Sequence, residues 1–146
     1  MQVFLDPLFA AHPDVKVVQF GYTVLGYGNI RDELLPCNLL APAMYTSCVD
    51  GFNGVNKTCA NEEFLSLQLA VEQLSVIYPD NHVSVNIAGA LQVAGGVEGA
   101  RIDSPNMDEF SPSEFFRGGG CIHANDAGYK HVFEALHEAY PFAELI

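Results

Sequence analysis

The chain has 146 residues, with 18 acidic and six basic side chains and a formal net charge of −12. So acidic a chain disfavours nucleic acid and anionic membrane surfaces as partners, because both carry negative charge themselves. No apolar run approaches the roughly 20 residues of a membrane-spanning helix, and Met1 leads into amphipathic sequence without the basic segment of a signal peptide. The length predicts a single domain, residues 1–146, with a sizeable core.

Strands and helices are predicted to alternate along the chain. An apolar run after the turn His12-Pro13-Asp14 indicates a buried parallel strand, and a later run alternates apolar residues with period two. The predicted elements are a helix over 1–11, a strand over 15–22, a helix over 61–78, a strand over 82–88 and a helix over 126–140. Two strands joined through a helix predict an α/β fold with a parallel sheet.

The cysteines indicate the compartment. Cys37, Cys48 and Cys59 recur at equal intervals in a loop-like segment, and Cys121 lies close to His123. An even number of cysteines in a loop-rich acidic chain favours disulfides and a secreted or lumenal location. We expect one local disulfide among the first three cysteines and a second that joins the remaining one to Cys121. Zinc is the less favoured alternative, since the chain has no Cys-x-x-Cys motif and no histidine pair at ligand spacing. No metal or other cofactor is expected.

An N-glycosylation sequon, Asn56-Lys57-Thr58, lies in the same region. It agrees with a secreted glycoprotein, because such sequons are modified on surface loops of secreted chains. If the protein is secreted, we expect its signal in sequence upstream of Met1.

The segment around His123 carries the strongest functional signal. The glycines at 118–120 lead to His123, which stands immediately before a helix opened by Asn125 and Asp126. This arrangement holds an imidazole at the edge of a cleft against a rigid element, where a general base is useful. The ordinary alternative is a surface or capping histidine. Asn125 is predicted to be the helix cap, and Asp126 a residue favoured by the helix dipole.

Residues 122–136 resemble the last sequence block of the SGNH (GDSL-type) serine hydrolases, which are esterases, lipases and carbohydrate deacetylases. That block reads Asp-x-x-His-Pro-Asn-x-x-Gly-Tyr/His. The positions of this chain that follow it in register are His123, Asn125, Gly128 and Tyr129. The resemblance implies a three-layer αβα flavodoxin-like fold and an ester substrate, either an acyl ester or an acetylated carbohydrate. It also implies that His123 accepts the proton of a serine nucleophile.

The chain departs from the family pattern at two of the three triad positions. The nucleophile block Gly-Asp-Ser does not occur, and Gly120 stands where the triad aspartate belongs. Ala124 replaces the usual proline. The group that orients the imidazole is expected to be Asp108 or a backbone carbonyl of the loop at 118–121, with Asp103 as a further candidate.

The resemblance covers nearly all of this chain but only the C-terminal part of the family's domain. Two parallel strands alone leave unpaired edges that invite association. We therefore expect either a missing N-terminal segment or a companion chain to complete the sheet. The competing expectation is a compact small domain with further strands between 30 and 60.

Three functions follow from these observations. The chain is the C-terminal segment of an active serine esterase, a non-catalytic relative with a binding or structural role, or an accessory subunit of a larger assembly. The first is preferred. In it, the loop over 26–60 shapes specificity, because loops at the carboxyl ends of strands line sites in open sheets. Aromatic residues that are candidates for an acyl pocket, or for ordinary core packing, are Tyr45, Phe52, Phe110, Phe115 and Phe116.

Overall fold

The computed structural model describes residues 1–24, 48, 56–116 and 123–140. In chain order its elements are α1 (Gln2–Ala11), β1 (Val17–Phe20), α4 (Lys57–Ile77), β2 (His82–Val85), α5 (Ala90–Ala94), the short 3-10 helix η3 (Ser113–Phe115) and α6 (Asp126–Ala139). β1 and β2 pair in parallel, from Val17 opposite His82 to Phe20 opposite Val85. The predicted α/β arrangement is confirmed, and each predicted helix and strand is present with slightly different ends. The further strands considered between 30 and 60 fall largely outside the described residues.

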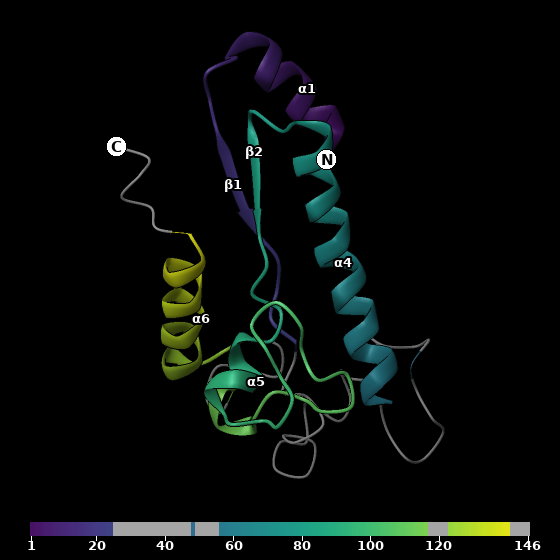
Figure 1. The fold of residues 1–146 in the computed structure, drawn as a ribbon, viewed down its shortest axis with the longest axis vertical. Coiled ribbons are helices and arrows are strands. Elements are labelled where there is room, and N and C mark those ends of the chain that lie inside the picture. The colour runs from purple at the N-terminus through teal and green to yellow at the C-terminus, as the bar shows by residue number, and fades with distance from the viewer. Residues whose placement is uncertain (25–47, 49–55, 117–122, 141–146) are drawn as a thin grey trace.

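Helices flank the two strands on both sides in Figure 1, where α4 and α6 each run against the strand direction. α5 and the chain that follows it lie at the carboxyl ends of the strands, whereas α1 lies at their amino ends. The segments that follow β1 and β2 stay adjacent beyond the strands, and the Val24 N–H donates to the Ala88 carbonyl at 2.8 Å. Among the described helices, none is both long and apolar enough to cross a membrane.

The side of the sheet toward α6 is apolar. Val85 belongs to one buried core cluster with Val132, Ala135 and Leu136 of α6, and Val18 and Val83 pack against it. These strand residues occupy alternate positions, as the period-two pattern predicts, so they share one face of the sheet. Burial of this face against the amphipathic helix α6 contributes to the apolar core of the described fold.

The side toward α4 carries several polar side chains, although Val17 also packs with Leu74 there. His82 is only 2% exposed, and its ring is held between Ser75 Oγ at 3.0 Å from Nδ1 and Gln19 Oε1 at 3.1 Å from Nε2. His82 is the first residue of β2, directly after a turn. It is a buried residue whose two ring nitrogens both have partners, as buried polar groups require.

We expect the buried His82 to make the protein less stable in mild acid. Burial lowers its pKa below the ordinary value of 6.5, so below that pH the unfolded chain binds a proton that the folded chain resists. The free energy of unfolding, measured by urea titration, should therefore fall as the pH is lowered from about 7.5 to about 5.5. His82→Gln should reduce this pH dependence, whereas His137→Gln, at an exposed position on α6, should retain it. An equal pH dependence in the His82→Gln protein would contradict the assignment.

β1 differs from its prediction in burial. The apolar run at 15–22 predicts a strand buried on both faces, but Val17–Gln19 are only partly buried and Phe20 is 44% exposed. The physical reason is that β1 has a partner on one edge only within the described residues. A strand of this composition is typical of a position inside a wider sheet.

Candidate functional site

The segment that carries His123 is fixed by the cap of α6. The Asn125 side chain accepts a hydrogen bond from the Gly128 N–H at 3.0 Å, which confirms its predicted capping role. Its amide also donates to the Glu114 carbonyl, and its backbone N–H donates to the Phe115 carbonyl. The start of α6 is thus tied to η3, and His123 lies exposed two residues before the cap.

Gly128 allows this close approach. A Cβ atom at position 128 would lie 2.6 Å from the Phe115 carbonyl oxygen and 2.9 Å from the Ala124 Cβ. Because real contacts are not so short, any side chain would push α6 away from η3. The glycine that follows the histidine in the sequence pattern therefore has a packing role at the start of α6.

Tyr22 is the residue that the structure brings to His123. Its hydroxyl lies 3.3 Å from His123 Nδ1, although the two residues are far apart in the sequence. Burial, followed by charge and hydrogen-bonding effects of Tyr129, raises the pKa of Tyr22 above 10.0. The phenol is therefore neutral at physiological pH. Among the described residues, Nε2 of His123 has no hydrogen-bond partner.

An apolar cavity of about 60 Å³ lies beside this pair. Its lining comes from the end of β1 and the residues after it, from the segment after β2, from the C-cap of η3 and from the segment around the start of α6. The lining residues include Tyr22, Thr23, Ile87, Phe116, Ala124 and Tyr129. Of the aromatic residues expected at an acyl pocket, Phe116 lines this cavity and Phe110 and Phe115 are buried in the core. Tyr45 and Phe52 lie outside the described residues.

The predicted acidic partners of His123 have other contacts. Asp108 accepts a hydrogen bond from the Thr58 hydroxyl at 2.7 Å, and Asp103 pairs with Arg101 at 3.1 Å. Within the described part of the chain, no hydrogen bond joins either carboxylate to His123. The pairing of Asp108 with His123 therefore stays a prediction, and the alternative carbonyls at 118–121 lie outside the described residues.

The remaining histidines are structural or peripheral. His12 is the C-cap of α1 and is exposed, as is His137 on α6. His131 is partly buried, with its ring edge-on to Phe115 at 5.1 Å and Nδ1 3.2 Å from the Glu134 carboxylate.

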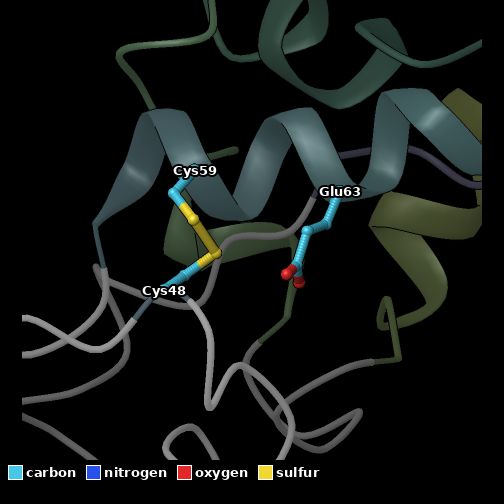
Figure 2. A group of neighbouring side chains, drawn as sticks. All are labelled: Cys48, Cys59 and Glu63. Atoms are coloured by element: carbon cyan, nitrogen blue, oxygen red, sulfur yellow. A yellow bond between two sulfur atoms is a disulfide. The ribbon is translucent and has the colours of Figure 1, made fainter.

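One local disulfide is present, as predicted. Cys48 and Cys59 are joined with their Cα atoms 5.5 Å apart, and Figure 2 shows the bond beside the start of α4, with Glu63 further along that helix. Within the described residues, these three side chains form a group close enough for a metal ion. The sulfurs are bonded to each other, however, and a metal needs the thiolate form. Cys37 and Cys121 lie outside the described residues.

The sequon residue Asn56 is the exposed N-cap of α4. Its side-chain oxygen accepts a hydrogen bond from the Cys59 N–H at 3.0 Å. The capping interaction uses the oxygen, whereas a glycan would be attached to the nitrogen. Glycosylation of Asn56 stays a prediction.

Sequence reasoning found His123 and its cap but not Tyr22. The sequence signal for Tyr22 was its place at the end of a predicted strand, at the edge where sites form in parallel sheets. Comparisons with protein-family models, with curated proteins and with solved structures found no match to this chain.

Proposed function

We propose that this chain is the C-terminal part of a secreted serine ester hydrolase of the three-layer αβα type, and that it supplies the general base, His123. The observation that carries the proposal is the placement of His123. It stands exposed beside an apolar cavity, with Nδ1 within reach of a hydroxyl and Nε2 without a partner among the described residues. The disulfide Cys48–Cys59 is compatible with an oxidising compartment.

In the proposed ester hydrolysis, the imidazole of His123 accepts a proton from the serine and returns it to the leaving alcohol. Nε2 of His123 takes the hydroxyl proton of the serine as its oxygen attacks the ester carbonyl carbon. The bond to the alcohol then breaks, and the alcohol leaves with the proton from Nε2. Water attacks the acyl-enzyme with the same assistance, which releases the carboxylic acid and restores the serine. The serine belongs to residues outside these 146, since no Gly-Asp-Ser motif occurs among them.

Completion of the sheet by another segment is part of the same proposal. β1 is paired on one edge only within the described residues and its Phe20 is 44% exposed. On α6, Phe133 is 61% exposed. Exposed apolar groups beside a free strand edge favour cover by further structure. We propose the N-terminal part of the hydrolase domain as that cover, either in the same polypeptide or as a companion chain.

The cavity supports a small acyl group as the substrate. A volume of about 60 Å³ holds roughly two water-sized groups, since each water in the liquid takes about 30 Å³. An acetyl group fits this space, whereas a long acyl chain would extend beyond it. Acetyl esters, including acetylated carbohydrates, are therefore the proposed substrate class.

A series of nitrophenyl esters tests this function on the protein purified from its natural source. We expect hydrolysis of the acetate, with kcat/KM lower by about tenfold or more for the octanoate, because the cavity cannot bury the longer chain. Equal rates for both esters would contradict the role of the cavity. The absence of hydrolysis of any ester would contradict the enzyme function and would favour a binding or structural subunit.

A further inference from the structure

The imidazole of a general base needs a hydrogen-bond acceptor on its second nitrogen. Without one, the ring rotates and the proton is free to occupy the nitrogen that must be vacant for catalysis. The position at which the resembling family carries an aspartate is Gly120, which has no side chain. Within the described residues, the polar group that approaches Nδ1 of His123 is the Tyr22 hydroxyl, at 3.3 Å.

Tyr22 reaches this contact from the end of β1, with 45% of the residue exposed. It follows β1 directly after Gly21, where a Cβ atom would lie 1.8 Å from Gln68 Oε1 of α4, so the glycine lets the strand end pack closely on that helix. The ring of Tyr22 packs against Phe64 of α4 with the ring centroids 6.1 Å apart. The close packing of the strand end and the ring contact with Phe64 both place the phenol against α4. Preorganisation of this kind is what a positioning residue requires.

The chemistry of a phenol suits the contact. A neutral hydroxyl carries one proton and two lone pairs, so its oxygen accepts a hydrogen bond while its proton is donated elsewhere. Burial and the neighbouring Tyr129 raise the pKa of Tyr22, which keeps the group neutral over the pH range in which a histidine base acts.

We propose that Tyr22 is the positioning residue of His123: its hydroxyl oxygen accepts the Nδ1–H bond and so leaves Nε2 as the basic nitrogen. Tyr22 takes the place that the resembling family gives to the triad aspartate. The catalytic role of Tyr22 rests on the proposed function. The tautomer that the inference predicts is a property of the protein without substrate.

The test is nitrogen NMR of the full protein with ¹⁵N-labelled histidine, at a pH where His123 is neutral. We expect the Nδ1–H tautomer in the wild type and a shift toward Nε2–H, the form that a free histidine side chain prefers, in Tyr22→Phe. That variant keeps the ring packing against Phe64, and its amide spectrum reports whether the fold is intact. Tyr78→Phe is the matched control, because it also removes a hydroxyl hydrogen bond, to Asp6, at the far end of α4. It should leave the His123 signals unchanged.

Two outcomes would overturn the inference. An Nε2–H tautomer in the wild type would mean that Tyr22 donates to the ring, and an Nδ1–H tautomer that persists in Tyr22→Phe would mean that another acceptor orients it. If the protein hydrolyses esters, kcat should also fall about tenfold in Tyr22→Phe with KM unchanged. A loss of this size corresponds to the contribution of one neutral hydrogen bond. Failure of the proposed function would abolish this kinetic effect but not the tautomer result, so the two failures are distinguishable.

Discussion

Replacement of His123 by glutamine is expected to lower kcat for ester hydrolysis by about 10⁴-fold or more. Glutamine keeps a polar side chain of similar reach, but its amide does not accept the proton of a serine at neutral pH. The serine would then attack as an alcohol rather than as an activated nucleophile. KM should change little, because His123 is exposed and lies beside the cavity rather than among its lining residues.

The control is His137→Gln, which makes the same chemical change at an exposed position of α6. It should leave kcat within about twofold of the wild type, since surface substitutions away from a site have small effects. A similar loss in both variants would show that His123 acts through the stability of α6. Full activity of His123→Gln would exclude it as the base.

Gln92→Leu is expected to destabilise the protein by about 3 kcal/mol. The Gln92 side chain is fully buried, and its amide donates to the carbonyls of Asn106 and Glu109 while its oxygen accepts the Asn106 N–H at 2.9 Å. Leucine has a similar volume but offers none of these contacts. The Asn106 N–H and carbonyl would then lose the Gln92 partner, whereas the Glu109 carbonyl keeps a bond from Asn61 at 2.8 Å.

Chemical unfolding followed by circular dichroism measures this loss. Gln73→Leu is the matched control, because Gln73 lies exposed on α4 and the same substitution there removes no buried contact. We expect the control to change the free energy of unfolding by less than about 0.5 kcal/mol. Equal effects of the two substitutions would show that Gln92 does not anchor the chain around Asn106.

The sequence predicted what depends on local pattern. The period-two alternation in 82–88 placed Val83 and Val85 on one face, and both pack toward α6. The Asn125 cap followed from a residue type that satisfies the free N–H groups of a helix start, and the structure confirms its bond to Gly128. One local disulfide was also expected, although the sequence did not choose Cys48–Cys59 among the first three cysteines.

What sequence reasoning missed depends on contacts between distant residues. Tyr22 meets His123 only because β1 ends beside the start of α6, and no residue near either one signals the contact. His82 is buried between β2 and α4, where Gln19 and Ser75 satisfy its two ring nitrogens. Apolar patterns do not reveal such a buried polar group. α5 was missed because it is a short helix, Ala90–Ala94, without a periodic pattern of its own.

The most direct test of the central claim is fluorophosphonate labelling of the protein from its natural source, with the adduct located by mass spectrometry. The reagent reacts with serines that a neighbouring base activates. We predict an adduct on a serine outside these 146 residues, in the same polypeptide or in a companion chain, and its loss in the protein that carries His123→Gln. An adduct that persists without His123, or no adduct on any chain associated with these residues, would contradict the role of His123 as the base of a serine hydrolase.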